Sequence, residues 1–561
     1  MPGIPLNQGE RVRLLVWIAI LAVGAALRLW QLPDQLLLDD EWHALRKLTR
    51  AGFAEILTSF GSADHSIPLT AYYNAISRWG GDVTEWRMRL PLLVAGMIMI
   101  VAIPLLARRV TTANERLLTG ALLAISPLMI YFSRQARPYT LSVLLTCIAI
   151  AAFWRWWHHR EHTWAMIYIG CTALAAWLLP ITLVFTLAPF VYFGAIAIWR
   201  SVRERNWSSV YPVIVLGFAT LIPLLILLAP PVVTDFESLA GKAGSDQVTP
   251  RSALVAIELF MGASNPAITL IWCSLGAYGA YLLFCRQRHL ATYLAVVAAI
   301  GITLIVSTNA ASISHGLVLA RYLLPLQPLL LVLVAIGAVG LLRLLPAAAA
   351  WPSAALALVA LYWLGPVPAQ YHQPINQLTG HAAYHFDYDF GRSAYRVMLP
   401  RGPVAPFHQR LAEIAPGSVT LIVMPWHIES HWNRMHYEQE SHRQRLLIGF
   451  ASGYCDSRIW GEYAPDARGV ALRHVARIEE VVAQPAQSEA DYLVFHKPAW
   501  EPPDPELDEW LGNRERLRPL RNLDSCLQQL HDDLGPPVYE DRAMVVFALE
   551  GDPADAASIS P

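Results

Sequence analysis

The stretch Leu36-Leu37-Leu38-Asp39-Asp40-Glu41-Trp42-His43 follows the first long apolar run of the chain by only a few residues. Three consecutive carboxylates therefore stand where a membrane helix would leave the bilayer. Transfer of a group to a hydroxyl needs a nearby base, and partial burial beside like charges raises the pKa of a carboxylate toward working pH. A solvated acidic turn after a membrane helix is the alternative interpretation.

The composition of the 561-residue chain is typical of a protein with many membrane spans. Hydrophobic residues make up 55% and charged residues 15%, whereas soluble domains are about a quarter charged. The formal net charge of −1 does not indicate a nucleic-acid partner. Neither a C-x-x-C nor an H-E-x-x-H pattern occurs, so the sequence does not support a metal site. We expect no cofactor, and the need for a divalent metal stays open.

Eleven apolar runs approach the length of about 20 residues that a spanning helix needs. They cover residues 12–31, 87–107, 116–133, 138–157, 163–179, 181–199, 208–229, 266–285, 290–307, 317–343 and 347–365. With a cytoplasmic N-terminus, every short inner connection carries Arg, as the positive-inside rule requires. We therefore expect a multi-pass protein of the plasma (inner) membrane, with its C-terminal region outside the cytoplasm. A cleavable signal peptide is the alternative for the first run.

Two connections on the predicted outer side are long. The loop 32–86 contains segments 41–60 and 66–80, whose mixture of apolar and polar residues at helical spacing predicts amphipathic helices on the membrane surface. The loop 230–265 begins with Pro230-Pro231 and contains a Gly-rich stretch around residue 243, which predicts a mobile connection.

The composition becomes polar after Gly365-Pro366. Strand-like runs at 419–424, 492–495 and 544–549 alternate with helix-like runs near 405–414 and 505–531. We therefore predict a polytopic α-helical membrane domain over residues 1–365 and an extracytoplasmic α/β domain over residues 366–561. The second domain, at about 190 residues, is large enough for its own core. If it is extracytoplasmic, Cys455 and Cys526 can form a disulfide.

Two elements with Arg are candidate phosphate sites. Arg134-Gln135-Ala136-Arg137-Pro138-Tyr139 opens the fourth span, where Pro138 suits the first helical turn and the helix N-terminus favours an anion. Arg321, followed by Tyr322, lies inside the tenth span, where a charge costs about 2.5–3.5 kcal/mol and needs a partner or a function. Snorkelling of Arg134 and Arg137 to lipid headgroups, and pairing of Arg321 with a carboxylate, are the alternatives.

His65 lies between the two amphipathic segments and could donate to a phosphate or a sugar hydroxyl, or be incidental. The predicted topology places His65, the acidic triplet and the Arg candidates at the same outer face. If each of these residues had an unrelated structural role, they would not need to lie on the same side of the membrane. A base for an acceptor and cations for a phosphate, at a membrane interface, favour a transferase with a lipid-phosphate-linked sugar.

The motifs, in this order, resemble those of GT-C fold membrane glycosyltransferases, in particular the protein O-mannosyltransferase and lipid A aminoarabinose transferase-like superfamily. The resemblance covers about residues 12–345. It rests on Asp40-Glu41, His65-Ser66-Ile67-Pro68-Leu69, Tyr72-Tyr73, Arg87-Met88-Arg89-Leu90-Pro91, Ser126-Pro127-Leu128-Met129-Ile130-Tyr131, Ala136-Arg137-Pro138-Tyr139 and Arg321-Tyr322-Leu323-Leu324-Pro325.

The resemblance implies a polyprenyl-phosphate-sugar donor, an inverting displacement and an acidic residue of the first outer loop as the base. Asp40 matches the Asp of the family's Asp-Glu pair, with Glu41 and Asp39 in support. Arg137 and Arg321 match positions near the lipid phosphate. The full set of expected substrate-binding residues is His65, Arg134, Arg137, Tyr139, Arg321 and Tyr322.

One departure from the family concerns Gln135, which stands where many relatives carry an acidic residue, so a second catalytic carboxylate there is in doubt. The acceptor can be a glycan, a lipid or a protein. A transporter or flippase of a lipid-linked sugar is the second interpretation, which explains a phosphate site but not the carboxylates. A membrane anchor for the C-terminal domain leaves Arg321 unexplained.

Overall fold

The structure is a computed structural model, and it describes part of the chain. The described residues are 8–30, 32, 41–60, 66–79, 83–244, 246–262, 266–343, 346, 353, 357, 404–424, 435–450, 475–488, 490–497, 523–541 and 544–549. They form two units, one of helices and one built on a β-sheet. The predicted boundary after residue 365 lies outside the described residues and stays a prediction.

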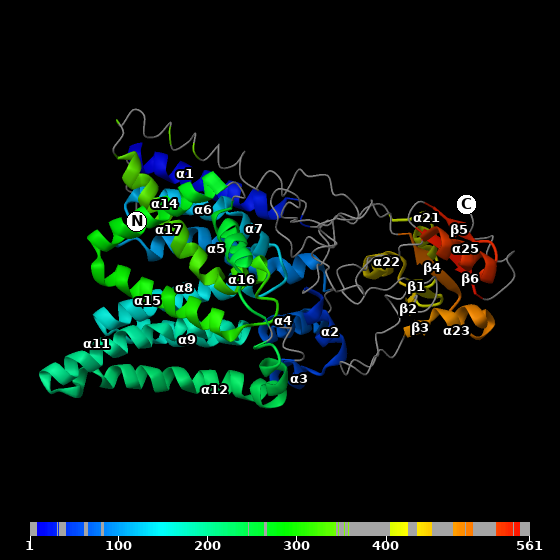
Figure 1. Ribbon diagram of the computed structural model, residues 1–561, viewed down its shortest axis with the longest axis horizontal. Helices are drawn as coiled ribbons and strands as arrows, with labels where there is room; N and C mark the ends of the chain where they lie inside the picture. The colour runs from blue at the N-terminus through cyan, green and yellow to red at the C-terminus, as the bar shows by residue number, and fades with distance from the viewer. Residues whose placement is uncertain are drawn as a thin grey trace. The chain divides into compact units, whose positions relative to one another are not determined.

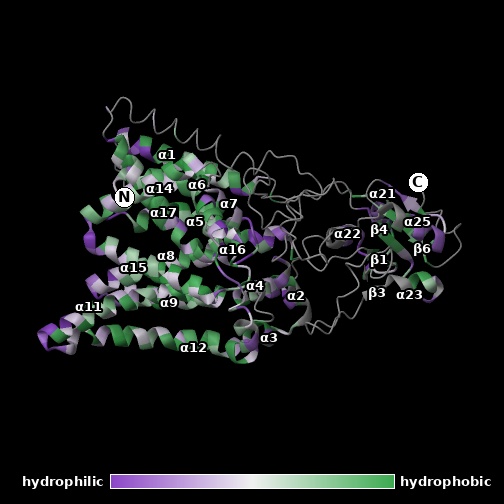
Figure 2. Cartoon of the chain, viewed as in Figure 1, coloured by the Kyte–Doolittle hydropathy of each residue, from purple (hydrophilic) through white to green (hydrophobic). Residues whose placement is uncertain are grey.

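The first unit consists of long apolar helices joined by shorter ones (Figures 1 and 2). Its α-helices are α1 (Gln8–Leu29), α2 (Trp42–Arg50), α3 (Phe53–Thr58), α4 (Ile67–Arg78), α5 (Glu85–Leu106), α6 (Ala113–Ile125), α7 (Pro127–Ser133), α8 (Tyr139–His159), α9 (His162–Leu178), α10 (Leu183–Thr186), α11 (Ala188–Glu204), α12 (Tyr211–Ala240), α13 (Pro250–Met261), α14 (Pro266–Arg286), α15 (Arg288–Thr308), α16 (Gly316–Leu323) and α17 (Gln327–Leu342). Short 3₁₀ turns are η3 (Pro180–Thr182), η4 (Trp207–Ser209) and η5 (Leu324–Leu326).

The predicted membrane spans correspond closely to these helices. Each predicted run from 12–31 to 317–343 coincides with a helix or with consecutive helices. Within the described part of the chain, eight helices are long and apolar enough to cross a membrane, or nine if the bent pair α6 and α7 is one span. The run 347–365 lies almost wholly outside the described residues, so the eleventh span stays a prediction. The class of polytopic helical membrane protein is confirmed.

Proline and glycine shape the helical packing. Helices α6 and α7 meet at an angle of 57° beside Pro127, which cannot donate a backbone hydrogen bond. Helices α14 and α17 approach so closely at Gly279 and Gly337 that a Cβ on Gly279 would lie 1.8 Å from the carbonyl oxygen of Leu333. Backbone contact of this kind is typical of membrane helices, where small residues allow van der Waals packing to hold helices together.

The two long connections that were predicted on the outer side both contain helices. The loop 32–86 contains α2, α3 and α4, as the amphipathic pattern predicted. The segment 230–265 differs from the mobile loop that we expected, since α12 and α13 occupy most of it. Between them, the backbone N–H of Gly244 donates to Thr308 at 2.9 Å, and that of Ala311 donates to Lys242 at 2.9 Å. The carboxylate of Asp246 also accepts the N–H of Ser314 at 2.9 Å, so the connection is held against the turn before α16.

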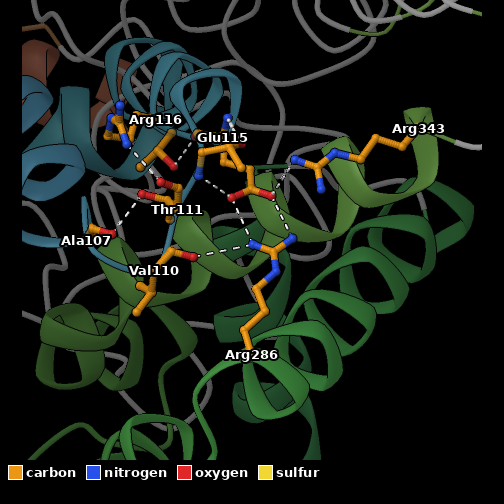
Figure 3. Close-up of polar contacts among 9 residues, drawn as sticks. Ala107, Val110, Thr111, Glu115, Arg116, Arg286 and Arg343 are labelled. Carbon is orange, nitrogen blue, oxygen red and sulfur yellow. Dashed lines mark hydrogen bonds and ion pairs between the residues drawn. The ribbon is translucent and has the colours of Figure 1, made fainter.

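At the opposite end of the helices, Glu115 joins three helix ends (Figure 3). Its carboxylate is fully buried and receives two hydrogen bonds from Arg286, at 2.8 and 3.0 Å, while Arg343 lies 3.7 Å away. The backbone N–H of Thr112 donates to the same carboxylate at 2.7 Å as part of a capping box. These residues come from three of the inner connections predicted from basic residues, so the structure places those connections together.

The second unit is a six-stranded mixed sheet with the order β3-β2-β1-β4-β6-β5. Strands β1 to β4 pair in parallel, whereas β6 runs antiparallel to both β4 and β5. The elements are α21 (Pro406–Glu413), β1 (Thr420–Met424), α22 (Met435–His442), β2 (Arg445–Phe450), β3 (Val475–Arg477), α23 (Ile478–Ala483), η8 (Pro485–Gln487), β4 (Tyr492–His496), α25 (Leu523–Leu534), β5 (Tyr539–Glu540) and β6 (Met544–Ala548). All five residues of β1 are buried, which indicates that both faces of the sheet are covered.

Candidate active site

Glu41 is buried and engaged by an arginine from a distant helix. Its side chain is 1% exposed, and that of Arg89, near the start of α5, is 0% exposed. The two form a bidentate pair, in which Nε and Nη2 of Arg89 each donate to a different carboxylate oxygen at 3.0 Å. Such forked geometry is the strongest way to pair these groups. Glu41 thus has a partner that fixes its orientation.

The carboxylate of Glu41 also binds the segment 134–139, which opens the fourth predicted span. The backbone N–H of Ala136 donates to Oε1 of Glu41 at 2.6 Å. Beside it, the hydroxyl of the buried Tyr73 lies 3.3 Å from the carbonyl oxygen of Met88 and 3.4 Å from that of Ala136. One polar cluster therefore joins Glu41, Tyr73, Met88, Arg89 and Ala136. This geometry favours a positioning role for Glu41, which we had expected to support the catalytic base.

Arg134 is directed at the end of α1. Its Nη1 donates to the carbonyl oxygens of Arg28 and Trp30, both at 2.9 Å, and lies 3.4 Å from that of Leu27. The last carbonyls of a helix have no partner within that helix, and a membrane interior offers no water to replace one. The placement of Arg134 favours a structural role over the substrate-binding role that we predicted.

Arg137, Tyr139 and Arg321 come together although they are far apart in the sequence. The guanidinium carbon of Arg137 lies 5.7 Å from the centre of the Tyr139 ring, and that of Arg321 lies 5.5 Å from the same ring. Arg321 also lies 5.5 Å from the ring of Tyr322. Nη2 of Arg137 is 3.5 Å from the Tyr139 hydroxyl. Cation–π attraction thus holds two positive charges beside one aromatic side chain, at the start of α8.

This pair of guanidinium groups is well suited to an anion. Both side chains are partly exposed, both are permanently charged, and a guanidinium presents in-plane donors that match phosphate oxygens. Among the described residues, no cluster of His, Cys, Asp or Glu could hold a metal ion.

Three predicted site residues, Asp39, Asp40 and His65, lie outside the described residues. Asp40 is the direct neighbour of Glu41 in the chain. Sequence reasoning identified Arg89 only as part of a motif, and it assigned no role to Arg28 or Tyr73. The signal that could have found Arg28 is its charge near the end of the first span, where a charge needs a partner.

Residues 64–228 match the family model of dolichyl-phosphate-mannose-protein mannosyltransferase. The fold is similar over almost the whole chain to ArnT from Cupriavidus metallidurans in the apo state, with a TM-score of 0.58 at 13% identity, covering 99% of this chain and 100% of that one. The chain has the GT-C fold. The predicted resemblance is therefore confirmed at the level of fold.

A second structure of the same GT-C protein, bound to undecaprenyl phosphate, is similar with a TM-score of 0.56 at 13% identity, covering 97% of this chain and 98% of that one. No curated protein matches the chain in sequence. The family-model match includes Arg89 and the segment 134–139, whereas Glu41 and Arg321 fall outside it. The convergence of Arg321 on Tyr139 is thus a finding of the structure.

Proposed function

We propose that this GT-C protein is a membrane glycosyltransferase that moves a sugar from a polyprenyl-phosphate carrier to an acceptor hydroxyl at the outer face of the membrane. The observation that carries the proposal is the placement of Arg137 and Arg321 beside Tyr139. The structure of ArnT bound to undecaprenyl phosphate supports the class of donor. The acceptor is a glycan, a lipid or a protein.

In the proposed reaction, Arg137 and Arg321 bind the donor phosphate and stabilise the charge that develops on it as the sugar leaves. Asp40 removes the proton from the acceptor hydroxyl while that oxygen attacks the anomeric carbon from the face opposite the phosphate, so the configuration inverts. Glu41 contributes by holding Asp40 and the segment with Arg137 in a fixed relation. Positioning and electrostatic stabilisation provide most of the acceleration.

The proposed orientation places the N-terminus in the cytoplasm and the C-terminal domain in the periplasm or an equivalent outer compartment. Cys526 supports this orientation, because it is disulfide-bonded and such bonds persist in oxidising compartments. Its expected partner Cys455 lies outside the described residues. Accessibility of single cysteines to a membrane-impermeant thiol reagent in intact cells measures the orientation directly.

Native mass spectrometry of the protein purified from its own membranes tests the donor site. We expect polyprenyl phosphate, or its glycosylated form, to co-purify with the wild type and to be lost from the double variant Arg137→Ala with Arg321→Ala. Arg251→Ala is the matched control, since Arg251 is exposed on α13. Absence of isoprenoid from a folded wild-type preparation, or its retention in the double variant, would contradict the phosphate site.

The lipid products distinguish a transferase from the alternative, a flippase. A transferase releases sugar-free polyprenyl phosphate in proportion to the glycosylated acceptor, whereas a flippase leaves the donor intact. Incubation of proteoliposomes with labelled donor and a membrane extract as the source of acceptor, followed by lipid chromatography, distinguishes the two. Intact donor after complete translocation would favour the flippase.

A further inference from the structure

The sheet of the C-terminal unit reverses its order of connection between β1 and β4. From β1 the chain continues to β2 and β3 on one side, and it then returns to β4 on the other side of β1. In open parallel sheets, ligands bind outside the carboxyl ends of the two strands at such a reversal, because the adjoining connections leave in opposite directions. Here those ends are Met424 of β1 and His496 of β4.

A histidine and a carboxylate meet at this edge. Nε2 of His496 lies 3.1 Å from Oε2 of Glu438, which comes from α22, the helix between β1 and β2. Their side chains are 25% and 21% exposed, so both are accessible from solvent. Strand β4 and helix α22 therefore position His496 and Glu438 beside the reversal of the sheet. A ligand could replace the contact between these two side chains with contacts of its own.

A third polar group lies behind this pair. His408 of α21 is 1% exposed, and its Nδ1 has no hydrogen-bond partner among the described residues. Burial lowers the pKa of His408, while Glu438 raises it and His496 lowers it, so the three groups interact electrostatically. A buried nitrogen without a partner costs free energy, and such groups in native structures often belong to binding sites.

The charge balance at this edge indicates the chemistry of the ligand. Lys497, beside His496, is paired with Glu540, and the carboxylate of Asp541 accepts hydrogen bonds from the Tyr539 hydroxyl at 2.7 Å and the Met544 N–H at 2.8 Å. The charge of Lys497 is thus matched by Glu540, and the remaining carboxylates of Glu438 and Asp541 do not favour an anion such as phosphate. A hydroxyl group both donates and accepts hydrogen bonds. A carboxylate can accept from it, and the N–H of a neighbouring histidine can donate to it.

We propose that the carboxyl edge of β1 and β4 is a saccharide-binding site, in which Glu438 and His496 contact hydroxyl groups of the sugar. The site goes beyond the proposed transfer reaction, because it lies in the other unit of the chain and needs neither the lipid phosphate nor Asp40. Glu438 accepts hydrogen bonds from two neighbouring hydroxyls, and the His496 ring binds an adjacent one. Such a site gives the protein affinity for glycan independently of the donor.

Saturation-transfer NMR on the full chain, in a detergent without a sugar headgroup, tests the site. The probes are the methyl glycosides of glucose, galactose, mannose and N-acetylglucosamine, with no lipid donor present. We expect at least one glycoside to give a signal with the wild type, and its affinity to fall about tenfold or more in Glu438→Gln and in His496→Ala, since hydrogen bonds to charged groups are the stronger class. Gln528→Ala, at an exposed position on α25, is the control and should bind as the wild type does.

The Asp40→Asn variant separates this inference from the proposed function, because it should lose transfer and keep glycoside binding. Failure of the transferase assay with intact binding would leave the saccharide site standing. Absence of signal from every glycoside with folded wild type, or equal affinities in Glu438→Gln and Gln528→Ala, would overturn the site. Displacement of a bound glycoside by millimolar inorganic phosphate, but not by excess of a second glycoside, would assign an anion site instead.

Discussion

Arg134 donates a hydrogen bond to the carbonyl oxygen of Arg28 at the end of α1, and Arg28 in turn donates to carbonyl oxygens at the end of α6. Arg28, in α1, donates to the carbonyl oxygens of Leu123 at 3.0 Å and Ala124 at 2.9 Å, at the end of α6. Arg134, which follows α7, donates to carbonyl oxygens at the end of α1. The two buried guanidinium groups thereby supply donors to the carbonyl groups at two helix ends.

We predict that Arg134→Ala destabilises the protein without removing the donor site. Each buried carbonyl left without a donor costs about 1–3 kcal/mol, so the thermal midpoint in detergent should fall clearly. Arg251→Ala is the control and should unfold as the wild type does. Loss of co-purifying isoprenoid from a normally stable Arg134→Ala variant would instead restore Arg134 to the phosphate site.

The pair formed by Glu41 and Arg89 should be important for stability and for transfer. Removing one partner of a buried ion pair costs about 3–5 kcal/mol, because the other charge remains buried. We expect Glu41→Gln and Arg89→Met each to lower the unfolding midpoint and the transfer rate. The double variant should lose much less than the sum of the two single losses, as a double-mutant cycle in denaturant would measure. Additive losses would mean that the two side chains act separately.

The replacement Asp40→Asn should remove transfer and leave donor binding intact. Amide and carboxyl groups have similar size, but the amide cannot accept the acceptor's proton, and a general base contributes about 10²–10⁴-fold to rate. The assay is transfer of labelled sugar at saturating donor, alongside native mass spectrometry of the bound lipid. Asp39→Asn is the neighbouring control, expected to lose less. A wild-type rate in Asp40→Asn would end its proposed role as the base.

The stability of the C-terminal domain should fall in acid through His442. Burial, together with the neighbouring His408 and against the opposite effect of Glu438, lowers the pKa of His442 to about 4, whereas an unperturbed histidine has a pKa of about 6.5. Between these values the unfolded domain binds more protons than the folded one, so stability decreases as pH falls from about 6.5 toward 4. Protonation would also break the hydrogen bond that the Gln444 N–H donates to Nδ1 of His442 at 3.0 Å.

Pulse proteolysis of the full chain in urea, following peptides from β1 and β4, measures this dependence at pH 7, 6, 5 and 4. His442→Gln should flatten the profile in this range, since glutamine can accept the same hydrogen bond and does not titrate. A wild-type profile as flat as that of His442→Gln would show that His442 does not set the acid stability of the domain.

The contact between α14 and α17 should tolerate no side chain at Gly279. An added Cβ would meet the backbone of Leu333, which can move only if the helices separate, and overpacking of a core typically costs about 1–3 kcal/mol or more. Gly276→Ala is the matched control on the same helix, where the nearest atom to an added Cβ is Cδ1 of Leu330 at 3.4 Å. Size-exclusion profiles and thermal midpoints in detergent compare the two, and equal behaviour would contradict the close packing.

The sequence predicted the membrane architecture because a helix that crosses the bilayer must be long and apolar. Both properties are visible in a single run of residues. It also predicted that Arg137 and Arg321 share a side, and the structure brings both to Tyr139. It did not predict that Arg134 binds the end of α1, because residues three positions apart around a helix end can face different neighbours. Nor did spacing indicate that Arg89, 48 positions away, is the partner of Glu41.

In the C-terminal unit, the runs at 419–424, 492–495 and 544–549 are confirmed as β1, β4 and β6. Strand β2 was missed, although Leu446-Leu447-Ile448 is a short apolar run of the length expected for a buried parallel strand. The parallel pairing of β1 with β4, which creates the reversal of the sheet, joins residues about 70 positions apart and cannot be read from local pattern. The candidate saccharide site was therefore visible only in three dimensions.

The hydrogen bond from Ala136 to Glu41 has a consequence for how this protein can diversify. It joins the segment that carries the proposed base to the segment that carries Arg137 within the helical unit, and no residue of the sheet unit takes part in it. Substitutions in the C-terminal unit, where we propose that glycan binds, therefore leave this contact between the two helical segments unchanged. The proposed reaction can then be inherited by proteins that bind different glycans.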